Sequence, residues 1–269
     1  MVIVIFENQD YATVIGSPAM PYLNGLASRF ALATNFFANT HPSQPNYFML
    51  STGQLISASD SFVGVVDVDN VVRQLVKAGK TWKSYAESLP SVGYVGGDVL
   101  PYVKRHNPFA YISDVINNPL QIQNLVPFSQ FQLDMAAGQL PNYSFIIPNQ
   151  VHNAHDCPDG SAAGNCPDAV KLAAADDWLR VNIDPLLANP QFQQSGLLIV
   201  TWDEASFADS THGGGRIAVI LAGPKIKPGF RSITFYQHES VLRLSLEALG
   251  LTSIPGAGAT APVMTEFFQ

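Results

Sequence analysis

Short apolar, β-branched segments alternate along this chain with segments of helical periodicity, and this alternation restricts the fold more than any other feature of the sequence. Alternating segments of these two kinds are typical of α/β proteins, in which helices cover both faces of a largely parallel sheet. We therefore expect an α/β fold. The expected strands are Val2–Phe6, Phe30–Phe37, Thr81–Ala86, Tyr143–Pro148, Leu197–Trp202 and Ile217–Ala222. The expected helices are Met20–Ala27, Asn46–Ser51, Asp69–Ala78, Ala169–Leu187 and His238–Leu249.

The size and composition of the chain suit one large domain over residues 1–269, with no linker or repeat to divide it. Hydrophobic residues make up 47% of the chain and charged residues 13%, which excludes intrinsic disorder. The formal net charge of -7 argues against a nucleic-acid partner, because phosphate backbones are bound by clustered cations. No segment approaches the roughly 20 apolar residues of a bilayer-spanning helix, so we expect no membrane span.

The two cysteines, Cys157 and Cys166, lie close together in a stretch that is typical of a loop, and their spacing fits a local disulfide. With His152 and His155 they also form a donor set that suits a structural zinc ion, although the long gap before Cys166 favours the disulfide. A disulfide indicates an oxidising compartment. We therefore expect a periplasmic or secreted protein, although no signal peptide is visible in this sequence.

Polar residues follow three of the expected strands, at the edge where parallel sheets bind ligands. These residues are Glu7 and Asn8, Asp203 and Glu204, and the group of Asn149, His152, His155 and Asp156. The three carboxylates Glu7, Asp203 and Glu204 are hard oxygen donors, and their charges would repel one another unless a cation or shared protons offset them. The sequence therefore predicts a divalent metal site. The alternative is that each carboxylate caps the segment after its strand.

A serine follows the second apolar run in the segment His41-Pro42-Ser43-Gln44-Pro45-Asn46-Tyr47. Ser43 suits the N-cap of a helix, and Pro45 suits its first turn. A hydroxyl at the positive end of a helix and near a metal would favour its alkoxide form, and the free amides there suit a phosphate. Ser43 is therefore a candidate nucleophile, and the alternative is an ordinary helix cap.

Four motifs occur in an order that resembles the phosphoesterase family of bacterial phospholipases C and acid phosphatases, within the alkaline phosphatase superfamily. They are Glu7-Asn8, Ser43-x-Pro45-Asn46, Thr201-Trp202-Asp203-Glu204 and Tyr236-x-His238-x-Ser240-x-Leu242-Arg243. The resemblance covers nearly the whole chain and implies an alkaline-phosphatase-like three-layer sandwich. It also implies a metal held by Glu7, Asn8, Ser43, Asp203 and Glu204, with Ser43 as nucleophile. His238 would contact the phosphate or a second metal, and Asn46 would contact the substrate.

The chain departs from the family pattern in two places. Ala205 and Ser206 follow the Asp-Glu pair where the family often has His, and no Asp-x-x-x-His spacing of a second metal site occurs, which leaves the number of metals open. His152, His155 and Asp156 occupy the corresponding region, so we expect them to contact phosphoryl oxygens or, in the case of His155, to protonate the leaving group.

A glycine-rich loop, Gly213-Gly214-Gly215, lies between His212 and Arg216, and we expect it to bring both side chains to the substrate. The same loop is similar to the oxyanion loop of serine esterases, but the Gly-x-Ser-x-Gly elbow of those enzymes is absent from the sequence.

Together these features predict a metal-dependent phosphoester hydrolase, an acid phosphatase-like phosphomonoesterase that acts through a phosphoserine intermediate. Its substrate would be a small phosphoester or a phospholipid head group. Two alternatives remain at this point: a phospholipase C or other phosphodiesterase, and a non-catalytic protein that binds metal or phosphate. The sequence does not name the metal, the substrate or the oligomeric state.

Overall fold

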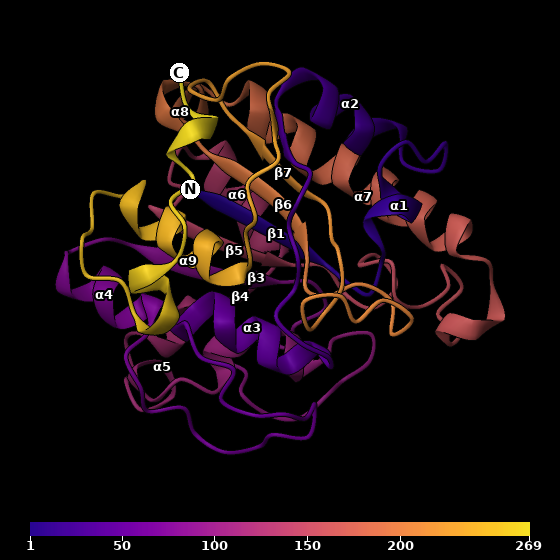
Figure 1. The fold of residues 1–269 in the computed structure, drawn as a ribbon. Coiled ribbons are helices and arrows are strands. Elements are labelled where there is room, and N and C mark those ends of the chain that lie inside the picture. Colours follow the sequence, from indigo (N-terminus) through magenta and orange to yellow (C-terminus); the bar gives the residue numbers. More distant parts are fainter.

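The computed structural model describes residues 1–269 as a twisted eight-stranded sheet between two groups of helices (Figure 1). The strands are β1 Val2–Phe6, β2 Ala31–Ala33, β3 Trp82–Ala86, β4 Leu125–Pro127, β5 Tyr143–Ile147, β6 Leu198–Trp202, β7 Val219–Ala222 and β8 Arg231–Ser232. Their spatial order is β4-β3-β5-β1-β6-β7-β2-β8. All neighbouring pairs are parallel except those of β7, which is antiparallel to both β6 and β2. The expected largely parallel sheet is confirmed.

Helices cover both faces of the sheet (Figure 1). They are α1 Tyr11–Val14, α2 Pro21–Arg29, α3 Ser43–Thr52, α4 Val71–Lys77, α5 Ser113–Ile116, α6 Ser129–Ala136, α7 Asp168–Ala188, α8 Pro190–Ser195 and α9 His238–Glu247. Helices α3, α4 and α9 contact one another in one layer, whereas α2 packs on α7 in the other. None of these helices combines the length and the apolar character that crossing a membrane requires.

The central strands are almost entirely apolar because both of their faces are covered. Every residue of β1 and of β6 is buried, and the rings of Phe6 and Trp202 at their carboxyl ends pack at 5.3 Å. The registers of β1 with β5 and with β6 are both parallel, so these three strands end at the same edge of the sheet. The segments that follow them are thereby brought together, as the positions of their polar residues predict.

The six expected strands and five expected helices are all present, with shifted bounds. The run Phe30–Phe37 contributes only Ala31–Ala33 as a strand, and Phe36 and Phe37 beyond it form only isolated bridges. The strands β4 and β8 were not expected, since they contain only three and two residues and show no periodicity. The short helices α1, α5 and α8 and helix α6 are further elements that the sequence pattern did not reveal.

Candidate functional site

Three buried carboxylates lie together where β1 and β6 end, and Asn8 joins them. Asn8 adopts a left-handed backbone with φ of 53°, which asparagine tolerates better than most residues. Its backbone amide donates to Asp203 Oδ1 at 3.3 Å, and its side-chain amide donates to Glu7 Oε2 at 3.4 Å. Asp203 Oδ1 also accepts the backbone amide of Glu204 at 2.7 Å. The two strand ends therefore form one continuous polar cluster.

The electrostatics of this cluster favour the addition of positive charge. Burial, together with the charges of Glu7 and Glu204, raises the pKa of Asp203 well above its ordinary value. Burial and the charge of Glu7 likewise raise the pKa of Glu204 to about 9. Burial would also raise the pKa of Glu7, but the charge and hydrogen bond of His106 outweigh it and lower that pKa to about 2. A bound proton or a cation would relieve the repulsion.

Ser43 begins helix α3 and lies against the carboxylates. The expectation that it is the N-cap of a helix starting at Asn46 is wrong, because α3 starts at Ser43 itself and its N-cap is Pro42. The Ser43 hydroxyl donates to Glu204 Oε1 at 3.4 Å and is only 4% exposed. It is thus free of a capping role, and as the first residue of the helix it stands where backbone amides lack intrahelical partners.

The side chain of Asn46 holds the loop that precedes Ser43. It is completely buried. The side-chain nitrogen donates to Glu204 Oε2 at 3.2 Å and to the carbonyl of Thr40 at 2.7 Å, and the side-chain oxygen accepts the backbone amides of Asn39 and Thr40. The expected contact of Asn46 with substrate stays a prediction.

The five expected ligands can be tested for their fit to a metal by asking which of their side-chain oxygens accept no hydrogen bond. Asn8 Oδ1 and Asp203 Oδ2 are buried and accept no hydrogen bond, whereas Glu7 Oε1 contacts His106. Buried acceptors without partners are rare in proteins, and carboxylate, amide and hydroxyl oxygens are the ligands that hard divalent cations prefer. The His, Cys, Asp and Glu side chains alone form no metal-binding group of three. Asn8 and Ser43 would therefore have to contribute.

His155 faces the cluster, with Asp156 behind it. His155 Nδ1 lies 2.7 Å from Asp156 Oδ1, and its Nε2 lies 3.9 Å from Glu7 Oε2. An imidazole held by a carboxylate on one nitrogen and directed at a site with the other is the usual arrangement of an acid–base histidine. Asp156 thus orients His155, and its expected contact with substrate stays a prediction.

His152 is directed elsewhere. Its Nδ1 lies 2.9 Å from Glu87 Oε1, which also accepts the indole N–H of Trp178 at 3.1 Å. The structure gives His152 no contact with Ser43 or with the carboxylate cluster. Glu87 therefore holds the His152 ring in place, and the expected contact of His152 with substrate stays a prediction.

His238, the first residue of α9, is fully buried behind Asp203. Its Nε2 donates to the main-chain carbonyl of Asp203 at 2.6 Å, while Nδ1 has no partner. Burial lowers the pKa of His238 to about 4, so the ring is neutral near pH 7. The neutral ring agrees with the sequence-based expectation, but burial is the dominant cause rather than the helix dipole.

The residues around the glycine-rich loop do not join the site. The ring of His212 packs edge-on against Phe37 at 4.5 Å and Phe235 at 4.8 Å. Arg216 donates to the carbonyl of Thr34 and lies 4.0 Å over the ring of Tyr11. Both side chains thus stabilise local packing, and neither of them contacts Ser43 or the carboxylates. Their expected role as substrate ligands stays a prediction.

Two histidines that the sequence did not single out do contact the carboxylates. His41 Nδ1 lies 3.2 Å from Glu204 Oε2, and its Nε2 donates to the carbonyl of Asp209 at 2.9 Å. His106 is buried and forms an ion pair with Glu7. The position of His41 two residues before Ser43 is a signal that could have identified it, whereas nothing in the sequence around His106 places it near Glu7.

Cys157 and Cys166 form a disulfide, with their Cα atoms 5.9 Å apart. Both sulfur atoms are therefore engaged, and the alternative of a zinc ion held by these cysteines with His152 and His155 is excluded. The bridge closes the loop between the His155 segment and α7.

Comparison with known proteins agrees with this geometry. The model of the Phosphoesterase family matches residues 17–251. A phosphatidylinositol-3-phosphatase of Mycobacterium tuberculosis is 32% identical over 270 residues, which cover 100% of this chain and 82% of that protein. A probable acid phosphatase of Kluyveromyces lactis is 31% identical over 91% of this chain and 56% of its own length, and an acid phosphatase of Aspergillus fumigatus is 31% identical over 92% and 54%. The chain spans little more than half of these two phosphatases.

Solved structures of low sequence identity share the fold. A protein of the alkaline phosphatase superfamily from Vibrio parahaemolyticus superposes with a TM-score of 0.64 at 13% identity, over 99% of this chain and 71% of that chain. A lipoteichoic acid synthase from Listeria monocytogenes gives a TM-score of 0.64 at 13% identity, over 96% and 73%. The expected sandwich of the alkaline phosphatase type is thereby confirmed. The matched motifs, the family model and the mycobacterial relative together show that the chain belongs to the Phosphoesterase family and is a hydrolase that acts on phosphoric ester bonds.

Proposed function

We propose that this chain is a metal-dependent phosphomonoesterase in which Ser43 is the nucleophile. The observation that carries the proposal is the buried Ser43 hydroxyl in contact with Glu204, within a cluster of carboxylate and amide oxygens that lack partners. A structural cap would satisfy a helix terminus, which Ser43 does not do. A buried hydroxyl beside three carboxylates is better explained by chemistry at that oxygen.

A divalent metal would be held by Glu7, Asn8, Ser43, Asp203 and Glu204. When bound, it would lower the pKa of the Ser43 hydroxyl and offset the negative charge of the phosphoryl oxygens. The high pKa of Asp203 and of Glu204 supports the proposal, because both carboxylates would gain from a cation that replaces their protons.

The reaction divides between Ser43 and His155. The Ser43 hydroxyl gives its proton to Glu204 Oε1, which it contacts at 3.4 Å, as its oxygen attacks phosphorus. A new O–P bond forms, and the bond from phosphorus to the leaving oxygen breaks. His155, oriented by Asp156 at 2.7 Å, donates the proton that the leaving alcohol needs. A water molecule then gives a proton back to the imidazole as it attacks phosphoserine, and Glu204 returns its proton to the Ser43 oxygen, which releases phosphate and restores the Ser43 hydroxyl.

The substrate we propose is a phosphomonoester, either a small soluble one or a phosphorylated lipid head group. Relatives named acid phosphatase and phosphatidylinositol-3-phosphatase support monoester chemistry for this chain. The disulfide between Cys157 and Cys166 supports a periplasmic or secreted location, since such bridges persist in oxidising compartments.

The test compares wild type with Ser43→Ala on p-nitrophenyl phosphate and bis(p-nitrophenyl) phosphate. Ser51→Ala is the matched control, because Ser51 lies in the same helix and bonds only the carbonyls of Tyr47 and Phe48. We expect Ser43→Ala to lose at least a thousandfold in kcat, a barrier increase of about 4 kcal/mol, with an unchanged melting temperature. Acid quenching of wild type during turnover should trap phosphate on Ser43.

Metal content and chelation complete the test. Purified wild type should contain a divalent metal, and chelation should remove metal and activity together. Full turnover by a folded Ser43→Ala protein would exclude the nucleophile, and turnover without metal would exclude the metal. Preference for the diester would indicate a phospholipase C or another phosphodiesterase, and bound metal without any hydrolysis would indicate a binding protein.

A further inference from the structure

A cavity of about 340 Å³ opens beside the catalytic cluster, within the size range of about 300–1,000 Å³ that is usual for small-ligand pockets. Asn8 and His155 form the wall that it shares with the cluster. The remaining walls come from the segment after β1, the start of α7 and the loop after β6, with Asp10, Lys171 and Phe207 as their most distinctive side chains. The proposed reaction leaves this cavity unused.

The cavity adjoins the cluster through Asn8, whose backbone amide donates to Asp203 Oδ1. His155, the proposed proton donor, lies in the same wall, where the leaving oxygen needs its proton.

The walls combine charged groups with one aromatic face. Lys171 has a side chain that is only 8% exposed, and its ammonium contacts Asp168 Oδ1 at 2.7 Å. Asp10 Oδ1 accepts the backbone amide of Ser206 at 2.8 Å. The ring of Phe207 is 69% exposed and stacks on His41 at 4.8 Å. Only three of the eleven lining residues are hydrophobic, so an apolar leaving group would find few partners here.

A buried ammonium, carboxylates at two walls and an exposed ring suit a ligand that has several hydroxyls and one flat C–H face. Hydroxyls can accept from Lys171 and donate to Asp10 and Asp168. An aromatic ring covers the C–H face of a saturated ring at little conformational cost.

We propose that this cavity binds the leaving group of the substrate, an inference that rests on the proposed function. The leaving group would be a cyclic polyol, such as an inositol or a pyranose sugar. Lys171 and Asp10 would be the residues that determine specificity for the polyol.

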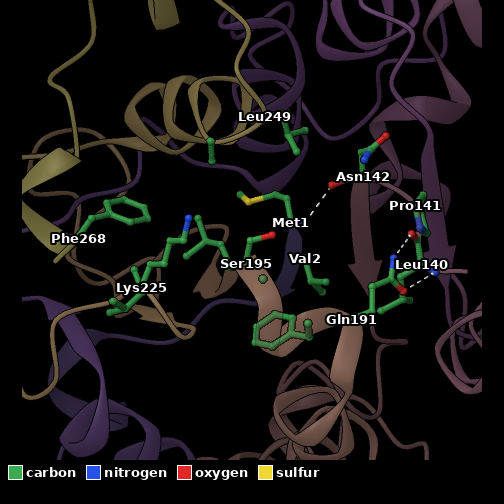
Figure 2. A pocket seen from close by; sticks show the side chains of 15 residues that line it. Met1, Val2, Leu140, Pro141, Asn142, Gln191, Ser195, Lys225, Leu249 and Phe268 are labelled. Atoms are coloured by element: carbon green, nitrogen blue, oxygen red, sulfur yellow. Dashed lines mark hydrogen bonds between the residues drawn. The ribbon is translucent and has the colours of Figure 1, made fainter. Parts of the chain in front are cut away.

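The experiment measures kcat/KM of the metal-loaded enzyme for myo-inositol 1-phosphate, glucose 6-phosphate and p-nitrophenyl phosphate. The readout is the kcat/KM for each polyol ester divided by the kcat/KM for the aryl ester. Lys171→Met should lower at least one of the two ratios tenfold or more, and the ratio that falls further separates an inositol from a sugar. Lys225→Met is the matched control with unchanged ratios, since Lys225 lines the cavity at the opposite, amino edge of the sheet (Figure 2).

A second variant covers the case in which Lys171→Met does not fold. Asp10→Asn keeps the oxygen that accepts the Ser206 amide while it removes the carboxylate charge. We expect it to lower the same ratio at least threefold. Ratios within twofold of wild type in every folded variant would overturn the subsite while the phosphomonoesterase stands. Wild type that cleaves the aryl ester but neither polyol ester would also overturn it, and wild type that cleaves none of the three would overturn the proposed function as well.

Discussion

The imidazole of His238 donates from Nε2 to the main-chain carbonyl of Asp203 at 2.6 Å. Because a carbonyl only accepts, the proton must lie on Nε2, and the unpartnered Nδ1 therefore carries a lone pair in a fully buried position. This bond joins the start of α9 to the strand end that carries two of the proposed metal ligands. The last helix of the chain thus has a direct part in holding Asp203 in place.

Two substitutions at His238 separate its contributions. His238→Gln keeps an amide donor for the Asp203 carbonyl, whereas His238→Ala removes the donor and leaves a cavity. If Nδ1 contacts the phosphate or a metal, we expect kcat/KM of both variants to fall at least tenfold, a loss of about 1.4 kcal/mol of transition-state stabilisation. His238→Ala should also lower the melting temperature more than His238→Gln does. Recovery of wild-type kinetics in His238→Gln would assign His238 to positioning alone.

The acid role of His155 predicts a dependence on the leaving group. Without a proton donor, an alkyl phosphate must expel a strongly basic alkoxide, whereas p-nitrophenolate leaves unaided. We therefore expect His155→Asn to reduce kcat at least a hundredfold for an alkyl phosphate and much less for p-nitrophenyl phosphate. His152→Asn is the control, since His152 pairs with Glu87 and is 36% exposed. Equal losses on both substrates in His155→Asn would contradict the role.

The sequence predicted those parts of the site that follow from sheet geometry. Glu7 and Asp203 could be placed together because parallel strands end at one edge, and β1 and β6 are neighbours. The contact of His106 with Glu7 depends on how a long loop folds back, and no local pattern encodes that path. The start of α3 was misplaced because Ser43 and Pro45 also fit a cap followed by a first turn.

Tertiary contacts also engage side chains for which residue type alone suggests a ligand-binding role. The guanidinium of Arg216 could bind a phosphate, yet in the folded chain it contacts the aromatic ring of Tyr11 and donates to the carbonyl of Thr34. Asn46 belongs to the motif that resembles the family, but its bonds to Glu204 and Thr40 are visible only once the loop is in place. Residue type predicted the chemistry available, and tertiary contacts decided its use.

Removal of the proposed metal should make stability fall as pH rises. The pKa of Glu204 is about 9 in the folded chain and 4.5 ordinarily, so between these values the folded state holds one proton more than the unfolded state. Stability must therefore decrease across that window. We expect the melting temperature of chelated wild type to fall from pH 5 to pH 9, and Glu204→Gln to reduce the slope. Restored metal should abolish the fall in wild type, whereas a flat profile in the chelated protein would contradict the prediction.

Asp134 provides an independent test of stability against pH, away from the site. Its Oδ2 accepts from the Tyr85 hydroxyl at 2.6 Å and from Lys83, while Oδ1 accepts from Gln130 at 2.8 Å. Burial alone would raise the pKa of Asp134, but these three partners outweigh burial and hold it below the ordinary 3.8. A depressed carboxyl pKa stabilises the fold above the unfolded value, and this stabilisation is lost as pH falls through the folded value.

Asp134→Asn should therefore destabilise the protein by about 1–3 kcal/mol at pH 7, since it removes a charged acceptor from three donors. The difference from wild type should begin to shrink below about pH 3.8, where the carboxyl of the unfolded chain takes up a proton, and should be lost as pH falls through the lower pKa of the folded state. Urea unfolding at pH 7 and pH 3 measures both quantities. Asp177→Asn is the control, because Asp177 pairs with Arg180 on the exposed face of α7 and its loss should matter much less. A penalty for Asp134→Asn that stays constant down to pH 3 would show that the hydrogen-bond geometry, rather than the charge, stabilises this contact between α6 and β3.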